Sequence, residues 1–243
     1  MTGIVPDWLL RRPIAHRGLH DETLVENTLG AVEAAIAADY AVEIDLQLTA
    51  DGGLVINHDE TLDRTTREKG RILDRTLDEL RSIQIAGSDE TLSSVTDLLA
   101  LTAGRAALFI ELKAPPRHED KARMAAAITR ALDTYGGAAA LMTFDPDLLA
   151  MLRQALKTTP LGILAGGEER TTPLVTRFGR DMLLHMARTQ PDFISYYVTA
   201  LPHPATTLGR RKRPVLTWTV RSRAEADRVS RYCDQIIFED FLA

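Results

Sequence analysis

The sequence predicts an α/β protein of the TIM (β/α)8 barrel class, and three observations support this prediction. Eight short apolar segments are rich in β-branched residues, as expected for buried strands. Amphipathic segments of helical period separate most of them, which indicates a parallel sheet. The length of 243 residues suits one barrel, because this class takes about 250 residues. We therefore expect residues 1–243 to form a single domain.

The elements of this barrel can be read in order along the chain. The eight predicted strands are residues 13–16, 41–46, 106–112, 139–143, 161–164, 192–197, 215–220 and 235–238. The predicted helices between them are residues 28–38, 119–135, 146–156, 180–189 and 222–232. In these helices apolar residues recur every three or four positions, so one face can pack on a sheet. Eight strands in such alternation favour closure into a barrel.

One segment interrupts the alternation after the second strand. Residues 54–59 have a strand pattern, yet only residues 50–53 separate them from the preceding strand. A gap that short permits a hairpin but not a parallel crossover. We expect residues 48–59 to form a hairpin that carries His58 back over the barrel mouth. The whole inserted segment, about residues 48–98, includes a short predicted helix at residues 76–82 and is either a lid or a spacer.

Composition excludes several classes of partner. The net charge of −5 gives no overall attraction to nucleic acid, and the basic run at residues 210–213 is typical of a solvated loop. Cys233 is the only cysteine, so neither an internal disulfide nor a thiolate zinc site is expected. No apolar run approaches the roughly 20 residues of a membrane span or resembles a signal peptide. We expect a cytoplasmic protein without stable membrane insertion.

Three carboxylates stand at strand positions that should face inward. In residues 42–46 side chains alternate, so Glu43 and Asp45 share one face, and Glu111 shares a face with Lys113 in a later strand. Buried carboxylates need a cation or dense hydrogen bonding. An all-oxygen donor set suits Mg²⁺ or Ca²⁺. The competing interpretation is a buried salt bridge in which Lys113 neutralises Glu43 or Asp45.

Two histidines are candidates for acid–base chemistry. His16 ends the first predicted strand, where Gly18 permits a sharp turn, and His58 lies in the hairpin. A histidine pair can exchange protons near neutral pH, and the guanidinium of Arg17 can bind phosphate oxygens. Each histidine alone would more often be an ordinary core or surface residue. Convergence with three acids on one barrel face favours a site.

Other polar and aromatic residues are given ordinary roles or two alternatives. Asn27 or Thr28 is expected to cap the first helix. Trp218 is expected either in the core or on a wall facing the substrate. The remaining histidines are interpreted as core or surface residues, and they are His20, His118, His185 and His203.

Eight short motifs follow one another between about residues 13 and 240. They are Ala15-His16-Arg17-Gly18, Glu26-Asn27-Thr28-Leu29, Glu43-Ile44-Asp45, Thr49-Ala50-Asp51-Gly52, Asn57-His58-Asp59, Leu62-Asp63-Arg64-Thr65-Thr66, Ile110-Glu111-Leu112-Lys113 and Trp218-Thr219-Val220. In this order and spacing the chain resembles the glycerophosphodiester phosphodiesterases. One such motif is weak evidence, whereas the ordered set is highly specific.

The resemblance implies a TIM barrel, a divalent cation such as Mg²⁺ or Ca²⁺, and hydrolysis of a glycerophosphodiester to glycerol 3-phosphate and an alcohol. The family's functional positions correspond here to His16 and His58 for the catalytic pair, to Glu43, Asp45 and Glu111 for the metal, and to Arg17 and Lys113 for the phosphate. The alcohol group, the acid and base roles and the oligomeric state stay open at this point. The alternatives are a barrel enzyme of other metal-assisted chemistry and a non-catalytic barrel that binds phosphorylated ligands.

The chain departs from the family pattern at four places. They are Val25 for proline, Tyr40-Ala41 for Gly-Ala, Arg221 for asparagine, and Phe238-Glu239-Asp240 for the usual threonine–aspartate pair. None touches the implied metal ligands or histidines, so they bear on the shape of the alcohol pocket. Glu239 is expected either to favour a cationic headgroup such as choline or to be solvated.

Overall fold

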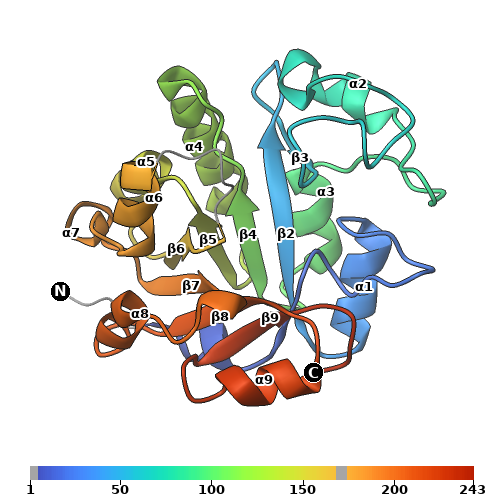
Figure 1. Ribbon diagram of the computed structural model, residues 1–243. Helices are drawn as coiled ribbons and strands as arrows, with labels where there is room; N and C mark the ends of the chain where they lie inside the picture. The colour runs from blue at the N-terminus through green and yellow to red at the C-terminus, as the bar shows by residue number, and fades with distance from the viewer. Residues whose placement is uncertain (1–4, 168–173) are drawn as a thin grey trace.

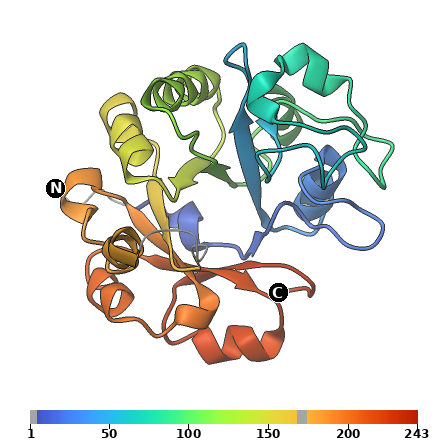
Figure 2. The same ribbon diagram turned by 45° about the horizontal axis from the view of Figure 1, so that its top comes forward.

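The computed structural model describes residues 5–167 and 174–243. Within these residues eight parallel strands form a ring with helices around it (Figures 1 and 2). They are β1 (Ile14–Ala15), β2 (Ala41–Leu48), β4 (Leu108–Leu112), β5 (Ala139–Thr143), β6 (Leu161–Ala165), β7 (Phe193–Tyr197), β8 (Val215–Val220) and β9 (Gln235–Phe238). Strand β1 pairs with both β9 and β2, which closes the ring. The predicted TIM barrel is confirmed.

The helices cover the outside of this ring. They are α1 (Leu29–Ala37), α3 (Val95–Thr102), α4 (His118–Asp133), α5 (Pro146–Ala155), α6 (Leu174–Asp181), α7 (Met186–Thr189), α8 (Pro204–Gly209) and α9 (Arg223–Val229), with the 3-10 helix η3 (Val198–Ala200). The 3-10 helix η1 (Asp7–Leu10) contributes Leu9 to the apolar interior of the ring, and η2 (Ile72–Asp74) lies in the inserted segment. The prediction of one helix over residues 180–189 is wrong, because Leu183 takes a positive φ of 55° between α6 and α7. Helices α3 and α8 were not predicted. Thr28, not Asn27, caps α1 by accepting a hydrogen bond from the N–H of Ala31.

Apolar side chains form one layer outside the strands and another inside the ring. On β2, Val42, Ile44 and Leu46 face the helices and belong to the outer layer. Ala41 of the same strand and Phe109 of β4 belong to the inner layer. The alternation of a β-strand therefore sends every second residue of β2 into the barrel, as the sequence predicted.

The inserted segment follows the carboxyl end of β2 and lies above and to the right of its arrowhead in Figure 1. Strand β3 (Leu54–Ile56) runs antiparallel to β2, which confirms the predicted hairpin. Helix α2 (Leu77–Arg81) confirms the predicted short helix, and it begins with a capping box formed by Thr76 and Glu79. The segment has a small apolar core of its own, made by Val55, Leu62, Ile72, Leu80, Ile83, Ile85 and Leu92. Within the described ranges no helix is both long and apolar enough to cross a membrane.

Candidate active site

Strand register brings the predicted acids and one predicted histidine together at the carboxyl end of the barrel. The β2–β4 pairing places Asp45 directly beside Glu111. On the other side of β2, at the end of β1, His16 Nε2 lies 3.9 Å from Glu43 Oε2. These polar residues form the layer directly above the apolar interior of the barrel. The sequence prediction that they converge is confirmed for these four residues.

The three carboxylates form a compact buried group. Oxygen atoms of Glu43, Asp45 and Glu111 lie within 4.8 Å of one another, and the three residues are 1%, 1% and 8% exposed. Lys113 Nζ lies 2.9 Å from Asp45 Oδ1 and 2.5 Å from Glu111 Oε1. The predicted salt bridge of Lys113 thus includes Asp45, while Glu43 Oε1 is buried without a hydrogen-bond partner.

The electrostatics of this group favour an additional cation. Burial raises the pKa of Glu43 well above its usual value, and the charges of Asp45 and Glu111 add to the effect. Burial also raises the pKa of Glu111. Burial opposes ionisation of Asp45 as well, but the charges of Lys113 and Arg17 hold its pKa below the usual value. The three carboxylates could hold a metal ion, because a hard cation would offset their mutual repulsion.

His16 is held by an acid that the sequence did not assign to it. Its Nδ1 lies 2.5 Å from Oε2 of Glu239, and Oε1 of Glu239 lies 2.6 Å from a guanidinium nitrogen of Arg221. A carboxylate only accepts hydrogen bonds, so Nδ1 of His16 donates to Glu239. The other ring nitrogen, Nε2, is directed at Glu43 of the three-carboxylate group. Burial lowers the pKa of His16, and the bond to Glu239 opposes this. Of the two alternatives for Glu239, the solvated one is wrong, since the side chain is only 12% exposed, and a preference for a cationic headgroup stays a prediction.

His58 shows the same arrangement in the hairpin. Its Nδ1 lies 2.7 Å from Oδ1 of Asp59, whose other oxygen accepts a hydrogen bond from Nε of Arg64 at 2.7 Å. That bond from Arg64 is the main reason why the pKa of Asp59 falls to about 2. Gln47 of β2 donates from its side-chain amide to the backbone carbonyl of His58 at 2.9 Å, so the hairpin holds His58 against the end of β2.

Arg17 and Asn27 surround Asp45 from the loop between β1 and α1. The guanidinium of Arg17 lies 2.9 Å from Glu26 Oε1 and 3.4 Å from Asp45 Oδ2. Its backbone N–H donates to Glu43 Oε2 at 2.9 Å. The amide of Asn27 donates to Asp45 Oδ2 at 2.9 Å and accepts from the backbone N–H of Asp45. Asn27 therefore positions a carboxylate instead of capping α1, a role that the local sequence did not reveal.

Trp218 lies half-buried at the end of β8. Its Nε1 donates to the carbonyl of Ser195 at 3.3 Å. Its ring packs edge-on against Phe144 with centroids 5.4 Å apart, and against Tyr197 at 5.1 Å. Trp218 thus packs against the inner apolar cluster, as the first alternative predicted, while a contact with substrate stays a prediction.

A cavity opens beside the carboxylate group. It has a volume of about 390 Å³, and Glu111, Lys113 and Phe144 contribute to its wall. Arg71 and Leu73 of the inserted segment line its other side. The insertion is therefore part of the pocket wall and not only a spacer.

Comparison with known proteins identifies the family. A model described as the glycerophosphoryl diester phosphodiesterase family matches residues 16–243. The chain belongs to this family. All the motifs quoted above fall within the match, apart from Ala15 at its edge.

Curated relatives of the family match a limited part of the chain. A glycerophosphodiester phosphodiesterase of Caldanaerobacter subterraneus is 47% identical over 72 residues, 29% of either chain. Glycerophosphodiester phosphodiesterase 1 of Bos taurus is 47% identical over 77 residues, 31% of this chain and 23% of that protein. The matched part of this chain thus spans less than a third of the length of these curated relatives.

Solved structures show the shared fold over nearly the whole chain. A family protein of Silicibacter pomeroyi superposes with a TM-score of 0.82 at 24% identity, over 95% of this chain and 90% of that one. A phosphodiesterase of Oleispira antarctica, in complex with the product sn-glycerol-3-phosphate, has a TM-score of 0.80 at 21% identity, over 96% and 94%. At such identities the likeness establishes the barrel fold alone.

Proposed function

We propose that the protein hydrolyses glycerophosphodiesters to glycerol 3-phosphate and an alcohol, with a divalent cation, Mg²⁺ or Ca²⁺, held by Glu43, Asp45 and Glu111. The observation that carries the proposal is the buried three-carboxylate group with His16 beside it, inside the segment that matches the family. A divalent cation at this position would supply the partner that the buried Oε1 of Glu43 lacks. When bound there, the cation supplies positive charge to a non-bridging phosphate oxygen.

The chain's own cations and histidines perform the remaining steps of the proposed mechanism. Arg17 and Lys113, which already contact the carboxylates, bind the phosphate and offset the charge that builds in the transition state. One histidine accepts the proton of the attacking oxygen at Nε2, and the other donates a proton to the departing alkoxide. Glu239 and Asp59 keep the Nδ1 atoms of His16 and His58 protonated, so Nε2 is the reacting nitrogen in both.

The direct test is release of glycerol 3-phosphate from glycerophosphocholine, followed with a coupled dehydrogenase. We expect turnover with Mg²⁺ or Ca²⁺ and none with chelator. Phosphorus NMR during the reaction distinguishes two attackers, because attack by the glycerol 2-hydroxyl forms a cyclic phosphate and attack by water does not. If no glycerophosphodiester or lysophospholipid is cleaved, the non-catalytic binding barrel becomes the leading interpretation.

The two histidines provide a second test. We expect His16→Ala and His58→Ala each to lower kcat by at least about a hundredfold, because each removes a proton donor or acceptor. Circular dichroism should show an intact fold in both variants. His118→Asn, an exposed histidine on α4, serves as the matched control and should keep full activity. Retained turnover in either site variant contradicts the two-histidine mechanism.

A further inference from the structure

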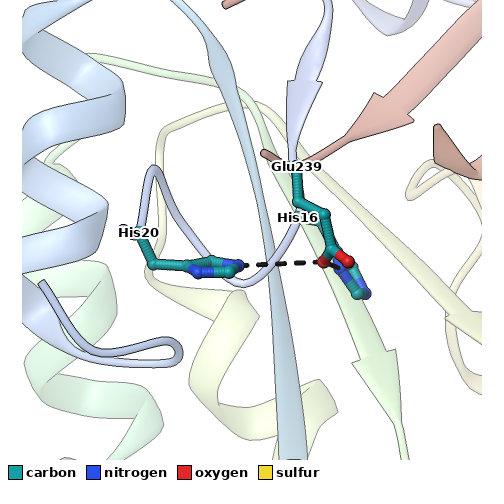
Figure 3. A group of neighbouring side chains, drawn as sticks. All are labelled: His16, His20 and Glu239. Carbon is teal, nitrogen blue, oxygen red and sulfur yellow. Dashed lines mark hydrogen bonds and ion pairs between the residues drawn. The ribbon is translucent and has the colours of Figure 1, made fainter. Parts of the chain in front are cut away.

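Beside the three-carboxylate group lies a second cluster of potential ligands with a different chemistry. His16, His20 and Glu239 offer two imidazole nitrogens and one carboxylate oxygen that lie within 4.8 Å of one another. Figure 3 shows both imidazoles directed at the carboxylate of Glu239. This cluster uses the Nδ1 side of His16, whereas Nε2 of the same ring faces Glu43.

His20 is the member that nothing in the proposed reaction requires. Its Nε2 is buried and has no hydrogen-bond partner, and it lies 3.8 Å from Glu239 Oε2, which is too long for a hydrogen bond. A buried polar atom without a partner calls for an explanation. The loop that carries it is held in place by Gly18, whose φ of +81° permits a turn so close to α1 that a Cβ would lie 2.7 Å from Ala31.

We propose that His16, His20 and Glu239 form an inhibitory site for Zn²⁺ or a similar nitrogen-preferring divalent metal, separate from the carboxylate site. Two imidazoles and one carboxylate are a donor set that Zn²⁺ prefers and that Mg²⁺ and Ca²⁺ do not. Ligand atoms at about 2.0–2.2 Å from a tetrahedral zinc lie roughly 3.3 Å apart. At present Glu239 Oε2 lies 2.5 Å from Nδ1 of His16 and 3.8 Å from Nε2 of His20. Both distances reach the spacing around zinc by shifts of less than about 1 Å.

Binding of Zn²⁺ at this site inhibits turnover because it changes which ring nitrogen of His16 carries the proton. In the metal-free cluster the proton of His16 sits on Nδ1, between that nitrogen and Glu239. Zn²⁺ takes the place of this proton on Nδ1, and the neutral ring then carries its proton on Nε2. If His16 is the base, an Nε2 that already bears a proton accepts none from the attacking oxygen. If His16 is the acid, the neutral ring holds its Nε2 proton far more tightly than the imidazolium that donates to the departing alkoxide. The inhibition rests on the proposed role of His16, whereas the binding of the metal does not.

The test measures binding and activity separately on the protein saturated with Mg²⁺. Zinc is titrated by calorimetry, and Co²⁺ is used as an optical probe because tetrahedral coordination gives intense visible absorption bands. We expect one further metal equivalent, tetrahedral Co²⁺ bands and loss of phosphodiesterase activity. His20→Asn should weaken zinc binding and zinc inhibition by at least about tenfold while turnover without zinc is unchanged.

His118→Asn controls for adventitious binding by histidine and should retain zinc inhibition at the wild-type concentration. His20→Gln provides a second substitution if His20→Asn unfolds. Zinc inhibition that persists unchanged in the His20 variants, or that is relieved by added Mg²⁺, places the zinc in the carboxylate site and overturns the proposal. If the protein shows no turnover at all, the proposed function fails, and the Co²⁺ bands still decide whether the site exists.

Discussion

Each histidine of the candidate site is held through Nδ1 by a carboxylate, and each carboxylate is held by an arginine. For His16 the partners are Glu239 and Arg221, which come from the ends of β9 and β8. Positions 221 and 239 both depart from the family pattern, and the structure shows that the two departures contact each other.

The sequence identified His16 by its motif and its place at a strand end, but it did not identify its partner. Glu239 lies 223 residues away along the chain. Strand alternation contains the missing signal, because Ile237 is inside the barrel and Glu239, two residues later, must face the same way. The contact itself depends on closure between β1 and β9, which local patterns do not reveal.

We expect Glu239→Gln to lower kcat by about a hundredfold or more with little change in KM. The glutamine amide can donate to Nδ1 of His16 and stabilise the wrong tautomer, as in catalytic triads with an amide in place of the acid. Steady-state kinetics with glycerophosphocholine measures both constants. Asp227→Asn, an exposed acid on α9, is the matched control. Equal losses in the two variants, or a loss confined to KM, would show that Glu239 does not orient His16.

The Arg221–Glu239 pair permits a double-variant cycle. Arg221→Asn removes the guanidinium that contacts Glu239, and Glu239→Asp shortens the acid. Because the two side chains contact each other, their effects on kcat should not add, and the double variant should be more active than the product of the single effects predicts. Strictly additive effects would mean that the two positions act independently.

At the scale of elements, the sequence predicted strands and long helices well and the broken helical region poorly. Apolar periodicity located β5, β8 and β9 with the bounds that the structure has. Residues 180–189 have the apolar pattern of one helix, and Leu183 fits this pattern because it is buried. The backbone at Leu183 is nevertheless left-handed, which no helix permits. A hydrophobic pattern indicates which side chains are buried, but it does not indicate the φ angle at which a helix ends.

The inserted segment is attached to the barrel partly through a helix cap. The carboxylate of Glu90 accepts hydrogen bonds from the N–H groups of Leu29 and Gly30, both at 3.0 Å, in the first turn of α1. A Cβ at position 30 would lie 2.7 Å from an oxygen of that carboxylate, so a larger residue there would displace the end of the Glu90 side chain. The acid also complements the positive end of the helix dipole.

We expect Glu90→Ala to lower the free energy of unfolding by about 1 kcal/mol, since two N–H groups of α1 lose their acceptor. Urea denaturation monitored by circular dichroism measures this difference. Asp89→Ala, an exposed neighbouring acid, is the matched control and should change stability little. A similar loss in both variants would mean that the effect comes from net charge and not from the cap.

At the scale of the whole molecule, the barrel could be predicted because strand and helix patterns alternate over most of the chain. The inward faces of β2 and β4 could be predicted as well, because alternation of polar and apolar residues in a barrel has one consistent solution. The network of Asn27, Arg17 and Glu26 around Asp45 could not, because it depends on how one loop folds over the closed ring.

The buried carboxylates that the proposed function requires lower the stability of the metal-free protein. Glu43 is 1% exposed, and the charges of Asp45 and Glu111 oppose its ionisation. Glu43→Gln puts a neutral group in place of a carboxyl group that is costly to ionise here, and the glutamine oxygen can still accept the backbone N–H of Arg17. We therefore expect the metal-free variant to melt at a higher temperature than the metal-free wild type, as at other functional sites that carry strain.

Metal binding should reverse the order of the two melting temperatures, so that the wild type melts at a higher temperature than Glu43→Gln. A cation at about 100 times its Kd stabilises the native wild type by about 2.7 kcal/mol through mass action, whereas the variant has lost one ligand and should gain much less. Thermal melts with chelator and with Mg²⁺ or Ca²⁺ measure both effects, with the exposed Glu22→Gln as a control for net charge. A metal-free Glu43→Gln protein less stable than wild type would mean that Glu43 is held by its neighbours and not repelled by them. An equal metal-induced rise in both proteins would remove Glu43 from the ligand set.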